Sequence, residues 1–325
     1  MTAAERTRAA FLKVIERPRV PLSPVIQGGI VRDGVGEERG SFAADASGRV
    51  PVLIVKRDGG AARKPAVIVL HGTGGTKESQ AVRLRRLAAL GFLAVAIDGR
   101  YHGERAPEAP ATMSAYEAAI LRAYRTQKEH PFLYDTVWDV MRLVDYLVTR
   151  DDVDPERIGL MGISKGGMET YLAAAVDPRI AAAVPLIGVQ SFRWGLEHGG
   201  WDSRAWTFRH AIAAAAGDSG ETINAAFMKK FYDRVAPGLY GEFDAPRMLP
   251  LVAPRPLLAI NGDSDPRTPM AGLKECAAAA EQAYAGAGAG GKFMLHLQPN
   301  AGHEVTAEGD QAALDWFVRW LAPRN

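Results

Sequence analysis

The sequence contains one cysteine, almost no net charge and no long hydrophobic run. Because Cys276 has no possible partner among the 325 residues, a disulfide within the chain is impossible, and zinc or redox motifs that need two cysteines are excluded. Lys and Arg total 39 and Asp and Glu total 37, so the net charge of +2 gives nucleic acid and anionic membranes little electrostatic attraction. A membrane span needs about 18 consecutive apolar residues, and Gly, Pro or charged residues interrupt every run before that length.

The first 20 residues also lack the apolar stretch of a secretory signal, because a charged residue recurs every few positions. We therefore predict a soluble, cytoplasmic protein without nucleic-acid or membrane partners; the composition says nothing about its oligomeric state. The 47% content of hydrophobic residues is typical of a chain that builds a large packed core.

Short apolar runs alternate with helix-like segments along most of the chain. A helix and a Pro-rich connector are expected over residues 1–39, followed by an antiparallel hairpin of strands at 40–45 and 50–57. Buried strands are then predicted at 66–70, 92–98, 157–163, 180–188, 256–263 and 292–299, and helices at 77–91, 115–149 with a break near Pro131, after Ser164 and at 307–321. This alternation predicts a single α/β domain over 1–325, with a mostly parallel central sheet covered by helices on both faces.

The stretch 189–252 departs from that alternation and is rich in aromatic residues. It reads as a helical cap inserted between two strands, with two open interpretations. The aromatics either fill a core of the cap itself or line a substrate pocket. Candidate substrate-binding residues in it are Trp194, Trp201 and Trp206.

A Gly-Ile-Ser-Lys-Gly-Gly segment at 162–167 joins a predicted strand directly to a predicted helix. In such a turn the central residue adopts a strained conformation, and the flanking glycines remove Cβ atoms that would collide. The pattern predicts Ser164 as a nucleophile; the alternative is a glycine-rich turn used for tight helix packing.

A serine nucleophile needs a base and a group that orients the base. His303 follows the last predicted strand, and Asp265 follows the one before it, so the chain order is Ser, Asp, His, as in α/β-hydrolases. Asp263 is the second candidate for the acid. His296 alternates within a strand and is expected to pack against the sheet, and Cys276, in the helix after the acid loop, offers no rival nucleophile.

The chain resembles the α/β-hydrolase superfamily, in particular the dienelactone hydrolase and prolyl-oligopeptidase-like esterase group. The resemblance rests on HGTGG at 71–75, DGRYHGER at 98–105, GISKGG at 162–167, NGDSDPRTP at 261–269 and NAGH at 300–303. In that group the acid precedes a proline by four positions, which Asp265 and Pro269 satisfy and Asp263 does not. The resemblance also implies an oxyanion hole formed by the backbone N–H groups of Thr73 and Lys165. HGTGG departs from the HGGG form of hormone-sensitive-lipase-like esterases. The Lys165 side chain is expected to reach solvent or a helix carboxylate in preference to an anionic substrate.

Two further patterns do not support a cofactor or a metal. GAGAGG at 286–291 precedes a strand instead of joining a strand to a helix, so a dinucleotide site is not predicted. His102 and Glu104 lack further ligands at metal spacing. The loop that contains them is expected to brace the site through charge pairs of Asp98, Arg100 and Arg105, and Tyr101 is a candidate substrate contact.

The sequence therefore predicts a serine carboxylesterase that acts on a small or medium ester without cofactor or metal. A thioesterase, an acyltransferase or a peptidase could use the same triad. Peptidases of this superfamily generally carry a propeller domain before the first strand, for which about 40 residues are too few. A non-catalytic binding protein with the hydrolase fold is the alternative from another class.

Overall fold

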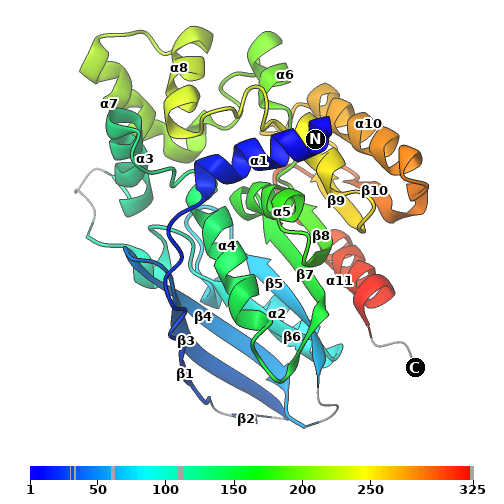
Figure 1. Ribbon diagram of the computed structural model, residues 1–325. Helices are drawn as coiled ribbons and strands as arrows, with labels where there is room; N and C mark the ends of the chain where they lie inside the picture. Colours follow the sequence, from blue (N-terminus) through cyan, green and yellow to red (C-terminus); the bar gives the residue numbers. More distant parts are fainter. Residues whose placement is uncertain (30, 33, 60–62, 109–112, 323–325) are drawn as a thin grey trace.

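A ten-stranded sheet forms the centre of the protein (Figure 1). A computed structural model describes residues 1–29, 31, 32, 34–59, 63–108 and 113–322. The strand order is β1-β3-β4-β6-β5-β7-β8-β9-β10, with β2 paired to β3. The strands are β1 (Val25–Gln27), β2 (Val31–Arg32), β3 (Val35–Asp45), β4 (Gly48–Arg57), β5 (Lys64–Leu70), β6 (Leu93–Ile97), β7 (Val153–Ile163), β8 (Ile180–Leu186), β9 (Leu257–Gly262) and β10 (Phe293–Gln298).

The sheet is antiparallel at its N-terminal edge and parallel elsewhere. β1, β3, β4 and β6 pair antiparallel, whereas every neighbouring pair from β6 through β10 is parallel. From β5 the chain moves to β6 on one side and then crosses back to β7 on the other. Ligand sites in open α/β sheets lie at the carboxyl ends of strands where the order reverses in this way, so the end of β7 beside β5 is the expected position. The predicted α/β architecture, with a mostly parallel sheet and a leading antiparallel hairpin, is present.

Helices cover both faces of the sheet (Figure 1). They are α1 (Ala3–Ile15), α2 (Ala81–Ala89), α3 (Ala115–Thr126), α4 (Tyr134–Leu147), α5 (Lys165–Val176), α6 (Phe192–Glu197), α7 (Arg209–Ser219), α8 (Ala225–Val235), α9 (Ala245–Met248), α10 (Met270–Gly286) and α11 (Ala307–Leu321). Buried side chains of α2 and α11 form one core layer with the sheet, and those of α4, α5 and α10 belong to the larger layer on the other face.

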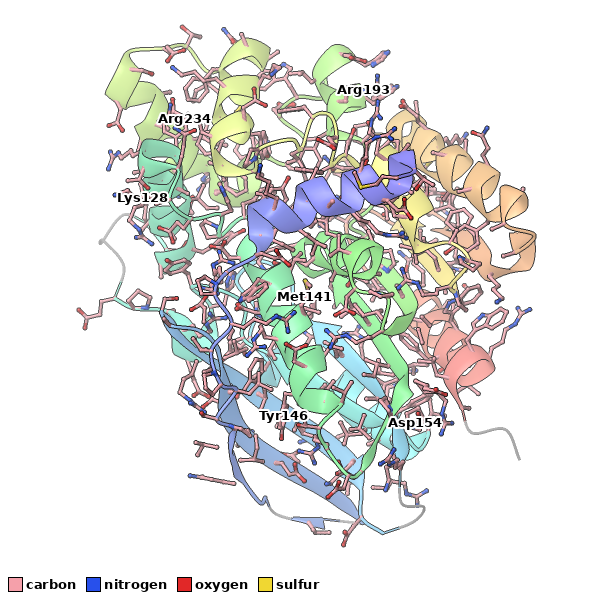
Figure 2. All side chains as sticks on the ribbon, in the orientation of Figure 1. Lys128, Met141, Tyr146, Asp154, Arg193 and Arg234 are labelled. Atoms are coloured by element: carbon pink, nitrogen blue, oxygen red, sulfur yellow. The ribbon has the colours of Figure 1, made fainter. Side chains whose placement is uncertain are left out.

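Close packing in both layers follows from residue size. A Cβ at Gly159 of β7 would lie 2.7 Å from side-chain atoms of Phe317 and Leu321, so the absence of a side chain there lets α11 approach the sheet. On the other face Tyr146 of α4, labelled in Figure 2, stacks on Phe42 of β3 with ring centroids 6.0 Å apart. Within the described ranges, no helix is long and apolar enough to cross a membrane.

Residues 187–256, between β8 and β9, form a helical insertion that contains α6, α7, α8 and α9. Figure 1 places α6, α7 and α8 together above the sheet, with α3 beside α7 and α8. Phe208, Phe231 and Tyr232 are buried, and Phe208 and Tyr232 pack around Phe132 with centroids 5.1 and 5.7 Å from its ring. The phenylalanines and tyrosines of the insertion therefore pack into a core that the insertion shares with the body of the protein, and not into a core of the cap alone.

The first 39 residues contain more strand than the sequence predicts. The helix is present as α1, but the expected connector holds β1, β2 and the start of β3, and residues 30 and 33 lie outside the described residues. The pattern gave no sign of β1 because it is three residues long and Val25 is 57% exposed, so it lacks an alternation of buried and exposed residues. At 286–291, α10 ends at Gly286 and a short turn leads into β10, with no strand-to-helix junction.

Candidate active site

Ser164 lies in a tight turn between the end of β7 and the start of α5. Its φ and ψ angles of 55° and −110° are unusual for a residue with a side chain. Its backbone N–H donates to the carbonyl oxygen of Leu186 at 2.8 Å, and its own carbonyl accepts from Met168 N–H at 3.0 Å. A Cβ at Gly166 would lie 2.7 Å from the carbonyl oxygens of Leu70 and His71. The turn is thus held between β5 and β8 by backbone contacts that tolerate no extra atoms.

Ser164, His303 and Asp265 form a continuous hydrogen-bonded row. The Oγ of Ser164 lies 2.8 Å from Nε2 of His303, and Nδ1 of His303 lies 2.8 Å from Oδ2 of Asp265. Because an ionised carboxylate can only accept, Nδ1 carries the proton and Nε2 is free to accept from the serine hydroxyl. The three residues come from the ends of β7, β9 and β10, which parallel pairing brings to one edge of the sheet.

The Asp265 carboxylate is held by its own loop. Oδ1 accepts from the backbone N–H of Arg267 at 2.8 Å, and Oδ2 accepts from the hydroxyl of Thr268 at 3.1 Å. Burial raises the pKa of this carboxyl, but the hydrogen bonds from His303 and Arg267 outweigh it, so its pKa lies below the ordinary value. Asp263 is exposed and accepts from the hydroxyl of Ser264, so the structure brings Asp265, and not Asp263, to the imidazole.

The surroundings of the His303 imidazole favour its neutral form. Burial lowers its pKa, the hydrogen bond to Asp265 raises it, and the charges of Arg204 and Arg267 lower it further; the pKa stays below its ordinary value. A neutral imidazole in contact with a hydroxyl is the arrangement that a general base requires.

Two backbone amides suit the role of oxyanion donors. The loop after β5 runs against the serine turn, since a Cβ at Gly72 would lie 3.7 Å from the Cβ of Ser164. Thr73 follows in that loop, and Lys165 is the first residue of α5, whose N–H has no partner within the helix. The loop that carries Thr73 and the first turn of α5 therefore both adjoin the serine turn.

The Lys165 side chain is buried, with its Nζ 2.5 Å from the carboxylate of Glu169 and 5.9 Å from the ring centroid of Tyr116. Of the two expected destinations, a helix carboxylate is the one observed, and the side chain does not reach solvent. Burial raises the pKa of Glu169 despite this contact.

His71 is a structural residue of the site that sequence reasoning did not single out. Its Nδ1 donates to the carbonyl oxygen of Gly72 at 2.7 Å, and its Nε2 accepts from Gly99 N–H at 3.0 Å. Burial and the nearby charge of Lys165 lower the pKa of His71 to about 4, so it is neutral. It ties the oxyanion loop to the end of β6. The role of His71 could have been predicted from its position directly after β5, as the first residue of HGTGG.

The candidate substrate-binding residues are dispersed. Tyr101 lines a cavity of about 220 Å³ together with Thr73 and Tyr116, and its hydroxyl accepts from Arg122 at 2.7 Å and donates to Glu129. Trp194 of α6 stacks on His198 at 4.4 Å, and a Cβ at Gly272 of α10 would lie 3.3 Å from its ring. Trp201 is partly buried against the core, whereas Trp206 is 66% exposed on the insertion.

The DGRYHGER loop forms the predicted charge pairs, and residues outside the loop supply the partners. Asp98 pairs with Lys77 at 2.9 Å, and Arg100 and Arg105 both pair with the fully buried Asp139, at 2.8 and 2.7 Å. The prediction that these three residues form charge pairs is therefore confirmed, and the partners Lys77 and Asp139 come from elsewhere in the chain. Among the residues that the structure describes, no group of three or more His, Cys, Asp or Glu side chains could hold a metal.

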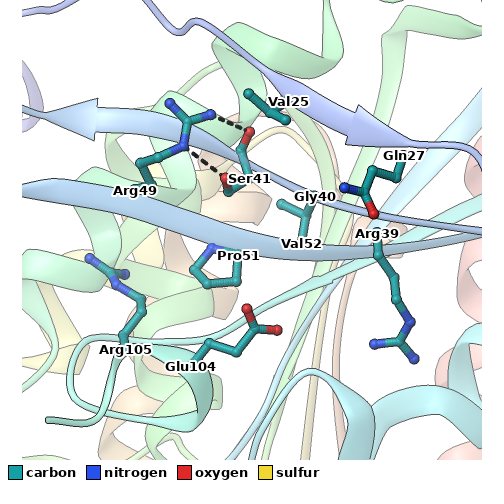
Figure 3. A pocket seen from close by; sticks show the side chains of 10 residues that line it. All are labelled: Val25, Gln27, Arg39, Gly40, Ser41, Arg49, Pro51, Val52, Glu104 and Arg105. Atoms are coloured by element: carbon teal, nitrogen blue, oxygen red, sulfur yellow. Dashed lines mark hydrogen bonds between the residues drawn. The ribbon is translucent and has the colours of Figure 1, made fainter.

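A second pocket, of about 440 Å³, lies over β1, β3 and β4 (Figure 3). Its arginines are engaged by the protein itself. Arg49 donates to the hydroxyl and carbonyl oxygens of Ser41 at 2.8 and 2.7 Å, and Arg39 pairs with Glu78 at 2.9 Å. None of Ser164, His303 or Asp265 lines this pocket, so it is separate from the row of reactive groups.

Two models of known protein families match the chain. The model of the prolyl oligopeptidase family matches residues 123–324, more than half of the chain. The chain belongs to the prolyl oligopeptidase family. The acetyl xylan esterase (AXE1) family model also matches, over residues 40–191.

Individual relatives of this prolyl oligopeptidase family member are mostly esterases or hydrolases by name. "Putative hydrolase YtaP" of Bacillus subtilis (strain 168) is 27% identical over 291 residues, 84% of each chain. Acetyl xylan esterase 1 from Thermoanaerobacterium sp. JW/SL YS485 superposes with a TM-score of 0.73 at 18% identity, over 98% of this chain and 94% of that one. The acetyl xylan esterase from Paenibacillus sp. R4 gives 0.64 at 19% identity, over 98% and 93%.

These matches confirm two predictions made from the motifs. The protein is a prolyl-oligopeptidase-like member of the α/β-hydrolases, and its enzyme class is a carboxylesterase-type hydrolase.

Proposed function

We propose that the protein hydrolyses small carboxylic esters through Ser164, His303 and Asp265 and an acyl-enzyme intermediate. The observation that carries the proposal is the hydrogen-bonded row Ser164 Oγ, His303 Nε2, His303 Nδ1, Asp265 Oδ2, with 2.8 Å at both contacts. In the first step Oγ attacks the ester carbonyl carbon while Nε2 takes the hydroxyl proton. The N–H groups of Thr73 and Lys165 would stabilise the negative oxygen that forms.

The rest of acylation, and the deacylation that follows it, use the same groups. His303 gives its proton to the departing alcohol, and the acyl group stays on Ser164. A water molecule then loses a proton to Nε2 and attacks the acyl carbon, which releases the acid and restores the serine. Asp265 keeps the imidazole in the required tautomer and stabilises its cationic form in both halves.

A cavity lies against the loop that carries Thr73, and none of Ser164, His303 or Asp265 lines it. Its volume is about 220 Å³, and glycines and alanines form much of its wall: Gly74, Gly75, Gly103, Ala106 and Ala115. The acetyl xylan esterase names among the structural relatives make acetyl esters the first substrates to test. The helical insertion would then act as a cap over 189–252 that contributes to substrate choice, and a cytoplasmic location stays a prediction from the sequence.

The direct test is hydrolysis of p-nitrophenyl acetate by the wild type and by Ser164→Ala. We expect the variant to lose at least about 10³-fold in kcat, because it retains the oxyanion donors but no nucleophile. Ser219→Ala, on the surface helix α7, is the matched control and should keep the wild-type rate. Equal rates for wild type and Ser164→Ala would contradict the proposal.

A second candidate function is peptide hydrolysis, because the family takes its name from a peptidase. A series of acyl esters and thioesters of increasing chain length, assayed beside a prolyl p-nitroanilide peptide, separates esterase, thioesterase and peptidase. Labelling by a fluorophosphonate probe distinguishes all three from a non-catalytic binding protein, which would not be labelled.

A further inference from the structure

Arg204 is a buried cation of the helical insertion that reaches the acid loop. It lies between α6 and α7 and is 3% exposed. Its Nε donates to the Oε1 of Gln190 at 2.5 Å, and its Nη2 donates to the carbonyl oxygen of Ile187 at 3.3 Å. The same Nη2 donates to the hydroxyl oxygen of Thr268 at 2.9 Å. The guanidinium thus joins the insertion to the loop that carries Asp265.

The contact with Thr268 fixes the direction of a hydrogen bond in the row of reactive groups. A threonine hydroxyl has one proton and accepts through its lone pairs. Because Nη2 of Arg204 donates to that oxygen, the hydroxyl proton points to Asp265 Oδ2, 3.1 Å away. This Oδ2 is the atom that also accepts from His303 Nδ1 at 2.8 Å. Arg204 is therefore two hydrogen bonds from the carboxylate and three from the imidazole.

Burial of the Arg204 charge costs folding free energy, which a purely structural role would not require. All three of its hydrogen bonds go to neutral groups, and burial lowers its pKa to about 10. It is still cationic near pH 7. A buried charge without a directly bonded counterion costs folding free energy, and an apolar side chain of similar size would avoid that cost. The carboxylate whose charge raises the pKa of Arg204 is Asp265.

We propose that Arg204 is a positioning residue for the reaction: its hydrogen bond to Thr268 directs the threonine hydroxyl to Asp265, the carboxylate that holds His303. This inference rests on the proposed use of Ser164, His303 and Asp265 in ester hydrolysis. The helical insertion would then contribute a residue that positions Asp265.

The charges around His303 give the sign of the expected pH effect. Burial lowers the pKa of His303, Asp265 raises it, and Arg204 and Arg267 lower it. The groups that act on Arg204 itself are Asp265, Arg267, Tyr232 and Tyr171. Removal of the Arg204 charge therefore raises the pKa of His303. In the plot of kcat/KM against pH, the acidic limb, where activity falls as His303 becomes protonated, moves to higher pH.

The experiment compares Arg204→Met, Arg204→Lys and Thr268→Val in the full-length protein, with p-nitrophenyl acetate as substrate. For Arg204→Met we expect kcat to fall by about 10- to 100-fold, KM to stay within about threefold, and the acidic limb to rise by about half a pH unit. Arg204→Lys keeps the charge and should keep the wild-type limb. Thr268→Val breaks the hydrogen-bond connection, so kcat should fall while the limb moves less than in Arg204→Met.

Arg255→Met is the matched control. Arg255 also has a pKa lowered to about 10 by burial, and it donates to backbone carbonyls of Ala174, Asp177 and Ile180, away from the reactive groups. Its loss should lower the Tm without a shift in the acidic limb.

Three results would overturn the proposal. One is an Arg204→Met enzyme with a lower Tm but a wild-type limb and a kcat within twofold. A second is an Arg204→Lys limb shifted as far as that of Arg204→Met. The third applies if Arg204→Met does not fold: it is a wild-type kcat in both Arg204→Lys and Thr268→Val. Failure of the proposed function would appear separately, as equal rates for the wild type and Ser164→Ala.

Discussion

The surroundings of Ser164 divide into two parts that are stabilised differently: the nucleophile side, formed by the ends of β5, β7 and β8, and the acid side, formed by Arg204, Thr268, Asp265 and His303. On the nucleophile side, the ends of β5, β7 and β8 meet through backbone atoms, and glycines allow the close approach. On the acid side, side chains make the contacts: Arg204 from the helical insertion, Thr268 and Asp265 from the acid loop, and His303 after β10. The first side is fixed by steric fit and the second by charge and hydrogen-bond direction. Substitutions on the two sides should therefore fail in different ways, one in stability and the other in rate and pH dependence.

The largest effect is expected from removal of the charge on the acid side. Asp265→Asn places an amide next to His303 Nδ1, which favours the wrong tautomer and no longer stabilises the imidazolium. We expect kcat to fall by roughly 10³- to 10⁴-fold with little change in the free energy of unfolding. Steady-state kinetics and urea denaturation measure the two quantities.

Asp263→Asn is the control for that change, since Asp263 is an exposed carboxylate two residues earlier in the same loop. It should keep kcat within about twofold, as for other exposed positions. A large loss in Asp263→Asn with an active Asp265→Asn would reverse the assignment of the acid.

On the nucleophile side a single methyl group should act mainly on stability. In Gly166→Ala the new Cβ would lie 2.7 Å from the carbonyl oxygens of Leu70 and His71, which are backbone atoms and cannot move aside. We expect a loss of about 2–4 kcal/mol in the free energy of unfolding. Urea denaturation followed by circular dichroism gives this value.

Gly217→Ala provides the same substitution without a clash. Gly217 lies within α7, and a Cβ there has no atom within 4 Å. It should stabilise the protein by about 0.5–1 kcal/mol, because alanine favours helix and restricts the unfolded chain. Similar losses at the two glycines would show that the contact at Gly166 is not the cause.

The smallest effect is a shift in the wild-type pH profile. The pKa of His303 lies below its ordinary value near 6.5, so the neutral, active form persists to lower pH. We expect the half-maximal point of kcat/KM on the acidic limb to fall below pH 6.5. Loss of the Asp265 carboxylate should lower it further and loss of the Arg204 charge should raise it. A half-maximal point above pH 6.5 would contradict the assigned environment.

The nucleophile side could be predicted from sequence because its determinants are local. Gly162, Ser164 and Gly166 lie within five residues, between an apolar strand pattern and a helix pattern, and the resulting turn follows from chain geometry. The same holds for the strands β5 to β9, whose apolar runs match the buried positions of the structure, whereas the predicted buried strand at β10 exposes Met294 and Leu297.

The acid side could be predicted only in part. The spacing of Asp265 and Pro269 selected the acid, but the role of Arg204 depends on a contact with Thr268 across 64 positions of the chain. Nothing near Arg204 in the sequence distinguishes it from the other arginines. The tryptophans show the same limit, because composition places Trp194 and Trp206 in one aromatic segment while the structure packs one against α10 and exposes the other.

Cys276, within α10, has no exposed surface, and burial raises the pKa of its thiol well above the ordinary value. A thiol that is neither accessible nor ionised does not react with maleimides in the folded protein. The natural cysteine is consequently not expected to be labelled when a second cysteine is introduced for site-directed labelling. A cysteine introduced in place of exposed Trp206 would carry a fluorophore on the helical insertion alone, with no need to remove the natural thiol first.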